Sequence, residues 1–169
     1  MALAMDEFAQ AFVARMQAEG VPLGITRIGV NTGPVIVGNF GGTKRFDYTA
    51  QGDAINTAAR LEAANKQLGT RICISGTTVL GCQDIQFRPI GSLMLRGKTI
   101  GVLTVEPIQA TALSDEDLQA YRKAYETLDT EAGAATITRL AASNTDDPLV
   151  SLNATRLEQG EAGTEIKIA

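Results

Sequence analysis

Residues 27–61 decide the fold of this chain, and they read RIGVNTGPVIVGNFGGTKRFDYTAQGDAINTAARL. Residues 23–30, which lead into this segment, alternate in character and predict a β-strand. Asn31–Pro34 is a turn signature rich in residues that favour tight bends, and residues 35–39 predict a second strand. The sequence therefore predicts that these two strands pair as a β-hairpin.

The second half of the same segment predicts a strand followed by a helix. Residues 45–50 are extended in pattern, and Asp53 is the predicted N-cap of a helix over 54–68 with small and apolar residues at helical spacing. Gly69 is placed to end that helix, because glycine readily adopts the left-handed backbone conformation of a C-terminal cap.

Two chemical interpretations stay open for this segment when it is taken by itself. Its glycines allow close backbone approach, but such a hairpin is more often a turn than a phosphate cradle, and the P-loop ending is missing. Asn56 and Arg60 are four residues apart and share one face of the predicted helix. An amide and a guanidinium on one face suit a sugar and a phosphate, whereas an exposed polar face is the alternative.

The rest of the chain adds mixed structure before residue 107 and mainly helices after it. The predicted helices are 2–19, 75–80, 114–128, 131–142 and 148–158, and the further predicted strands are 70–74, 87–95 and 101–106. The tail from Gln159 onward is predicted to be frayed. We therefore expect an α+β domain over residues 1–108 and a helical C-terminal extension over residues 109–169, packed as a helical hairpin on the domain.

Composition limits the classes of function. The chain of 169 residues has a net charge of −4, a pI of about 4.9 and no basic stripe, so a nucleic-acid partner is not expected. It has no long apolar run, so no membrane contact is expected from it. Histidine is absent, which excludes hydrolase triads that use it. Cys73 and Cys82 are expected to be buried thiols in a reducing cytoplasm.

Taken together, residues 29–61 closely resemble the catalytic domain of bacterial class III adenylyl/guanylyl cyclases. That family carries a Gly-Ile-His/Asn-Thr-Gly-Pro-Val-Val-Ala-Gly hairpin and then Asp-Tyr-Thr-Val-Ile-Gly-Asp-Thr-Val-Asn-Leu-Ala-Ala-Arg-Leu. This sequence departs from the pattern at Ala50, Gln51 and Thr57. The later Leu95–Lys98 resembles the family's Leu-Lys-Gly-Lys turn. The resemblance spans about residues 2–108 and implies a ferredoxin-like cyclase fold.

The resemblance also implies roles for particular residues. Asn56 would orient the ribose and the reacting hydroxyl, and Arg60 would stabilise negative charge on the α-phosphate in the transition state. Thr49 falls where the family contacts the base, and there it favours ATP over GTP. Lys98 would meet the terminal phosphates, with Arg96 as its substitute.

One half of the family's site has no counterpart in this sequence. The family binds two Mg²⁺ or Mn²⁺ ions through two aspartates that precede the part matched here, and neither aspartate motif occurs. We therefore expect this chain to be the C-terminal portion of such a domain, truncated on its N-terminal side. It would bind no metal, and it would be inactive alone. The missing central strand would favour a homodimer or a strand-exchanged oligomer.

The function that the resemblance implies is conversion of ATP to cyclic AMP and pyrophosphate in intracellular signalling. The expected location is the cytoplasm, including that of the cytoplasmic part of a membrane-bound sensor. The alternative is a non-catalytic regulatory or dimerisation module that pairs with a complete cyclase.

Overall fold

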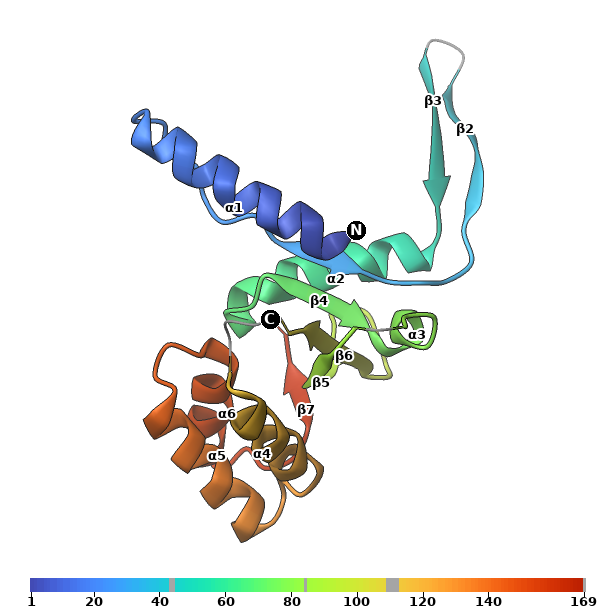
Figure 1. Cartoon of the computed structure of the whole chain (residues 1–169). Helices are drawn as coiled ribbons and strands as arrows, with labels where there is room; N and C mark the ends of the chain where they lie inside the picture. The colour runs from blue at the N-terminus through green and yellow to red at the C-terminus, as the bar shows by residue number, and fades with distance from the viewer. Residues whose placement is uncertain (43–44, 84, 109–112, 169) are drawn as a thin grey trace.

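The protein is described by a computed structural model that covers residues 1–42, 45–83, 85–108 and 113–168. Its elements are a mixture of helices and strands before residue 108 and are mainly helices after it (Figure 1). They are α1 (Ala2–Ala18), β1 (Ile28–Val30), β2 (Ile36–Gly42), β3 (Arg45–Gln51), α2 (Asp53–Leu68), β4 (Ile72–Ser75), α3 (Gly76–Val79), β5 (Phe87–Met94), β6 (Val102–Pro107), α4 (Asp115–Glu126), α5 (Glu131–Ser143), α6 (Pro148–Glu158) and β7 (Glu165–Lys167). The α+β class is confirmed.

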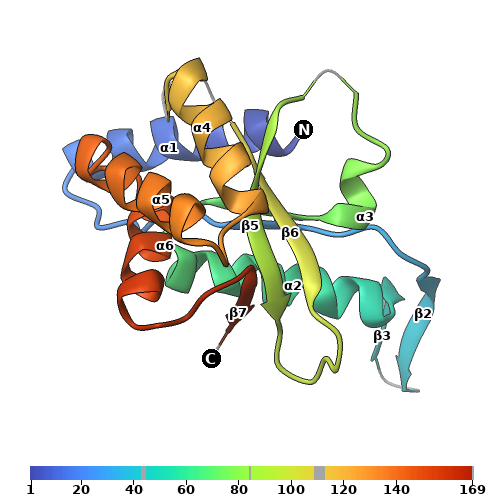
Figure 2. The same cartoon turned by 90° about the horizontal axis from the view of Figure 1, so that it is seen from below.

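Five strands form the main sheet in the order β1-β4-β6-β5-β7. The sheet is mixed, because β4–β6 and β5–β6 are antiparallel while β1–β4 and β5–β7 are parallel. Figure 2 shows α2 running alongside these strands, with the β2–β3 pair beyond the end of α2. The sheet thus provides the platform on which α2 lies.

The helices α4–α6 pack on the sheet and share its hydrophobic core. The buried cluster joins Leu61 of α2 and Leu93 of β5 with Tyr121, Leu140 and Val150 of the three helices. Each helix begins at a side-chain cap, since Ser114, Thr130 and Asp147 accept hydrogen bonds from backbone N–H groups. The predicted packing of the C-terminal helices against the domain is confirmed, whereas the division at residues 108 and 109 stays a prediction.

A buried ion-pair network ties these helices to the sheet. The Arg88 guanidinium on β5 lies 2.8 Å from the Glu106 carboxylate and 2.6 Å from that of Asp147, at the start of α6. Tyr121 of α4 donates a hydrogen bond to the Pro89 carbonyl at 2.9 Å and accepts one from Asn153 at 3.1 Å. Among the described residues of this network, no buried side-chain nitrogen or oxygen lacks a hydrogen-bond partner, so the burial is compensated.

The predicted pairing of residues 23–30 with residues 35–39 is wrong. The first strand is only β1, and it pairs parallel with β4, Ile28 opposite Ile72. β2 instead pairs antiparallel with β3, from Ile36 opposite Gln51 to Gly42 opposite Arg45. This two-stranded arm extends away from the sheet, at the upper right of Figure 1. The Asn31–Pro34 turn redirects the chain without forming a hairpin.

The prediction of a frayed tail is also wrong. The strand β7 pairs parallel with β5, Ile166 opposite Leu93. Ile166 is buried, and the Arg156 guanidinium donates to the carbonyls of Gly163 and Glu165. One buried isoleucine and one arginine therefore hold the tail as the last strand of the sheet.

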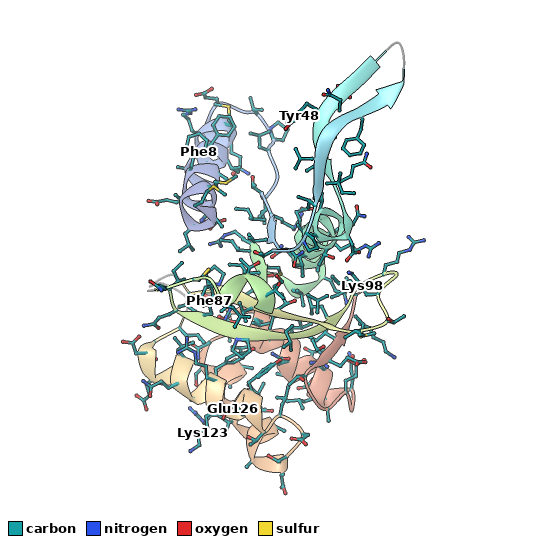
Figure 3. All side chains as sticks on the ribbon, turned by 90° about the vertical axis from the view of Figure 1, so that its right-hand side faces the viewer. Phe8, Tyr48, Phe87, Lys98, Lys123 and Glu126 are labelled. Carbon is teal, nitrogen blue, oxygen red and sulfur yellow. The ribbon has the colours of Figure 1, made fainter. Side chains whose placement is uncertain are left out.

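The predicted first helix is confirmed as α1, with its aromatic side chains in solvent. Phe8 is 70% exposed and stacks on Phe12, and Figure 3 shows Phe8 on the outer part of the molecule. Asp6 is the buried residue of this helix and accepts hydrogen bonds from Arg71 at 3.0 and 3.1 Å. An ion pair thus connects α1 to the segment that leads into β4.

Candidate functional site

The backbone of α2 lies directly against β1. A Cβ atom added at Gly29 would come within 2.1 Å of the Ala58 carbonyl oxygen and 2.3 Å of the Glu62 nitrogen. Both are backbone atoms of α2, so glycine is required here for close approach. The close approach at Gly29 is therefore to a helix, and the choice between a turn and a phosphate cradle stays a prediction.

A buried amide fixes the position of α2 along the sheet. Asn65 is fully buried, and its Nδ2 donates to the carbonyl of Ile28 on β1 at 3.1 Å and to that of Leu61 at 3.0 Å. Its Oδ1 accepts hydrogen bonds from Thr70 at 2.7 Å and Cys73 at 3.2 Å. Asn65 therefore links α2 to β1 and β4, and sequence patterning gave no signal of it.

The first half of α2 carries the predicted polar face. The prediction of Asp53 as the N-cap is wrong, because Gly52 is the N-cap and the helix begins at Asp53, one residue earlier than predicted. Asn56 is exposed and Arg60 is half-buried one turn further along. Gly69 ends the helix in a left-handed conformation with φ 72°, as predicted. Asn56 thus lies near the start of α2, whereas Asn65 lies near its other end.

Arg60 faces the turn between β5 and β6. A Cβ atom added at Gly97 would lie 3.5 Å from Nη2 of Arg60, and Gly97 has φ +74°, a conformation that favours glycine. The turn is closed by a hydrogen bond of 2.9 Å from the Lys98 amide to the Leu95 carbonyl. The fold therefore brings Arg60 and Lys98 to one place from positions 38 residues apart in the sequence.

Lys98 is held there by an ion pair with Asp53. The Lys98 Nζ donates to Oδ2 of Asp53 at the start of α2, and Figure 3 shows Lys98 at the end of the β5–β6 loop. The Lys98 side chain is 23% exposed and that of Asp53 is 72% exposed. This hydrogen bond, with the nearby charges of Lys98 and Arg60, lowers the pKa of Asp53. The pair was not predicted, because Asp53 was interpreted only as a helix cap.

Two other predicted residues are exposed. Thr49 lies on β3 opposite Gly38 in the two-stranded arm. Arg96 lies in the same turn as Gly97, and its side chain is exposed. The described contacts thus unite Arg60, Lys98 and Asp53, with Asn56 on the same stretch of helix.

An open groove of about 840 Å³ lies beside the Asp53–Lys98 pair. Its lining includes the Thr32, Ser75 and Thr77 hydroxyl groups and apolar side chains of the 98–103 segment. Thr78 shares hydrogen bonds with Thr32 at 3.0 Å and Ser75 at 3.1 Å, which orders the floor of the groove. Its volume is in the range of small-molecule sites. The sequence predicted neither the groove nor its hydroxyl groups.

Comparison with known families decides the class of protein. The family described as "Adenylate and Guanylate cyclase catalytic domain" matches residues 1–109 of this chain, which is more than half of its 169 residues. The chain belongs to this family. The cyclase resemblance of the central segment is therefore confirmed at the level of the family.

Individual relatives support the same assignment. This cyclase-family chain is 42% identical over 99 residues to Adenylate cyclase 1 of Rhizobium meliloti, covering 58% of the chain and 15% of that relative. It is 36% identical over 86 residues to an adenylate cyclase of Anabaena cylindrica, covering 50% of the chain and 17% of the relative. The chain therefore spans less than a fifth of the length of these two relatives.

A solved structure gives the same fold. The crystal structure of the adenylyl cyclase CyaB from P. aeruginosa superposes with a TM-score of 0.55 at 30% identity. The match covers 66% of this chain and 58% of that structure. The mixed α+β architecture of the cyclase family is thus present in this chain.

Cyclases of this family use divalent metal ions. Outside residues 43–44, 84, 109–112 and 169, no group of three or more His, Cys, Asp or Glu side chains is placed to hold a metal ion. The Asp53 carboxylate, which lines the groove, forms an ion pair with Lys98.

Within the same described residues, no helix is long and apolar enough to cross a membrane.

Proposed function

We propose that this chain supplies half of the active site of a nucleotide cyclase, the half that orients the ribose and stabilises the transition state. The complete site would convert ATP to cyclic AMP and pyrophosphate in intracellular signalling. The observation that carries the proposal is the grouping of Arg60 and Lys98 around the Gly97 turn, with Asn56 one helical turn away. Two cations from different elements converge there. That arrangement suits a polyphosphate more than a single neutral ligand.

In the proposed reaction, each side chain acts on a different part of the nucleotide. The 3′-hydroxyl oxygen attacks the α-phosphorus, the bond to the bridging oxygen breaks, and pyrophosphate leaves. Asn56 orients the ribose so that its hydroxyl is in line with that bond, and Arg60 stabilises the charge that develops on the α-phosphate oxygens. Lys98 binds the terminal phosphates, which become the leaving group. Arg96 is the substitute for Lys98 in this role.

We infer that Thr49 contacts the purine base of the nucleotide and so determines which nucleotide is preferred. Its hydroxyl is exposed on β3 and can donate to or accept from the edge of a purine. We infer a preference for ATP over GTP, which the names of the adenylate cyclase relatives support.

We infer that the other half of the site comes from a second polypeptide or a separate segment. The two metal-binding aspartates of the family have no counterpart in this sequence, so a symmetric pair of these chains would contain Asn56 and Arg60 twice and the aspartates never. The chain alone, given ATP and Mn²⁺ at high protein concentration, is expected to form no cyclic AMP. Product above the buffer blank would contradict this expectation.

Exposed apolar side chains favour a second role, as a module that pairs with a complete cyclase. Phe8 of α1 is 70% exposed, Ile36 of β2 is 72% exposed and Tyr48 of β3 is 76% exposed. Such surfaces are typical of protein interfaces. The same surfaces would support a homodimer or strand-exchanged oligomer, and a stable monomer on gel filtration with light scattering would contradict self-association.

Complementation tests the proposed function. The partner is an adenylate cyclase domain that keeps the two family aspartates and has its own Asn and Arg replaced by Ala, so that it is inactive. Adding this chain should restore cyclic AMP formation, and the Asn56→Ala chain should restore none. Arg139→Ala, which removes an exposed arginine from α5, is the matched control and should restore full activity. Complex formation without any cyclic AMP would leave the pairing module as the function.

A further inference from the structure

The ion pair between Asp53 and Lys98 bears on how tightly the site holds phosphate. Lys98 comes from the β5–β6 turn and Asp53 from the first turn of α2, so the ion pair joins the start of α2 to this turn. Both side chains reach solvent, which means that an incoming anion can approach Lys98 without unfolding anything. The carboxylate therefore occupies the place that an incoming phosphate oxygen would take.

Charge explains why the carboxylate is there when no anion is bound. Lys98 and Arg60 lie around the same turn, and the positive end of the α2 dipole adds to their potential. Asp53 neutralises part of this positive potential, and both cations in turn hold it in its charged form. Without Asp53, the two cations would repel each other and attract any anion in solution.

We propose that Asp53 is an internal competitor for phosphate, which lowers the affinity of the Lys98 and Arg60 site for pyrophosphate and so favours product release. This rests on the proposed function, because it takes Lys98 to be the group that binds the terminal phosphates. When the nucleotide binds, its terminal phosphates displace the Asp53 carboxylate from Lys98. When pyrophosphate leaves, the carboxylate returns to the ammonium group. No bond is made or broken in this exchange.

The size of the effect follows from Coulomb's law in a site open to water. Removing one negative charge about 5 Å from a multiply charged anion, at the dielectric constant of water and with screening by salt, strengthens binding about five- to tenfold. The Asp53→Asn variant keeps the size and shape of the side chain and removes the charge. Asp53→Ser removes the charge with a different side chain and keeps a residue that is favourable near a helix start.

Titration calorimetry of the whole chain with inorganic pyrophosphate, in metal-free buffer at about 50 mM salt, tests the proposal. Asp53→Asn and Asp53→Ser should bind pyrophosphate about five- to tenfold more tightly than the wild type. The control is Glu126→Gln, which makes the same change in net charge on α4. Figure 3 shows Glu126 among the helices below the sheet and Lys98 at the loop on the right. The Glu126→Gln chain should bind pyrophosphate within twofold of the wild type.

The Lys98→Gln variant separates failure of this inference from failure of the proposed function. If Lys98→Gln weakens pyrophosphate binding and both Asp53 variants bind as the wild type does, Asp53 is not a competitor and only this inference is overturned. If Lys98→Gln binds pyrophosphate as tightly as the wild type, Lys98 is not the phosphate-binding group and both are overturned. Tighter binding by the Asp53 variants, lost again in the Asp53→Asn/Lys98→Gln double variant, supports the inference.

Discussion

Gly29→Ala is the substitution whose effect follows most directly from the geometry. The added methyl group would lie 2.1 Å from the Ala58 carbonyl oxygen and 2.3 Å from the Glu62 nitrogen. Both are backbone atoms held in helical hydrogen bonds, so no side-chain rotation can relieve the overlap. The helix α2 must move off β1, which also strains the hydrogen bond of 3.1 Å from Asn65 to Ile28.

The expected cost is at the upper end of the range for overpacking, about 3 kcal/mol. For a chain of this length it corresponds to a fall in melting temperature of roughly 6–12 °C. Gly24→Ala is the matched control, because a Cβ atom added there would have no neighbour within 4 Å. Thermal and urea unfolding followed by circular dichroism measure both variants. A Gly29→Ala protein within about 1 kcal/mol of Gly24→Ala would refute the close packing of α2 on β1.

Three further predictions concern the core and its links. Cys73 is buried as predicted, whereas Cys82 is only partly buried, so its predicted burial is wrong. Burial raises the pKa of the Cys73 thiol to about 12. A thiol reagent at pH 8 should therefore label Cys82 in the native chain and both cysteines only in denaturant, and rapid labelling of both in the native chain would contradict the packing. Tyr121→Phe removes a hydrogen-bond partner from both the Asn153 amide and the Pro89 carbonyl. It should lower the free energy of unfolding in urea by about 1–3 kcal/mol, and an unchanged free energy would contradict these hydrogen bonds. Arg88→Ala should lower the free energy of unfolding by about 3–5 kcal/mol, because it leaves the Glu106 and Asp147 carboxylates without their partner. An equal loss of stability at pH 5 and pH 8 would show that unpaired carboxylates are not the cause.

The sign of that pH dependence follows from Glu106. Burial raises the pKa of the Glu106 carboxyl, and the Arg88 charge partly opposes the rise. Removing Arg88 would raise the pKa of Glu106 further. A carboxyl with a raised pKa in the folded state favours folding at low pH, and this contribution is lost as the pH rises through its folded pKa. The Arg88→Ala protein should therefore lose less stability, relative to the wild type, at pH 5 than at pH 8.

Local patterning was enough to predict most elements of this chain. The helix α2 carried apolar spacing and a glycine after its last residue, and α4 carried a Ser114 cap with an acidic first turn. These signals are contained within one stretch of sequence. For that reason α1, α2 and α4–α6 were predicted within a few residues of their ends.

Pairing between distant segments could not be predicted in the same way. The Asn31–Pro34 turn suggested that its two flanking strands pair, but β1 instead pairs with β4 about 40 residues away, where its glycine can meet α2. The strand β7 has Ile166 as its one buried residue, which leaves no periodic pattern to detect. The Asp53–Lys98 pair likewise depends on a turn that only the folded sheet brings to α2.

The central claim is that Arg60 stabilises the transition state in a site completed by another polypeptide. Its most direct measurement is the kcat and KM for ATP of the complemented complex, with wild-type and Arg60→Ala chains compared at saturating partner. The account predicts that kcat falls about 10²- to 10³-fold while KM changes little, as expected for a group that acts on developing charge. An unchanged kcat, or a loss confined to KM, would contradict it.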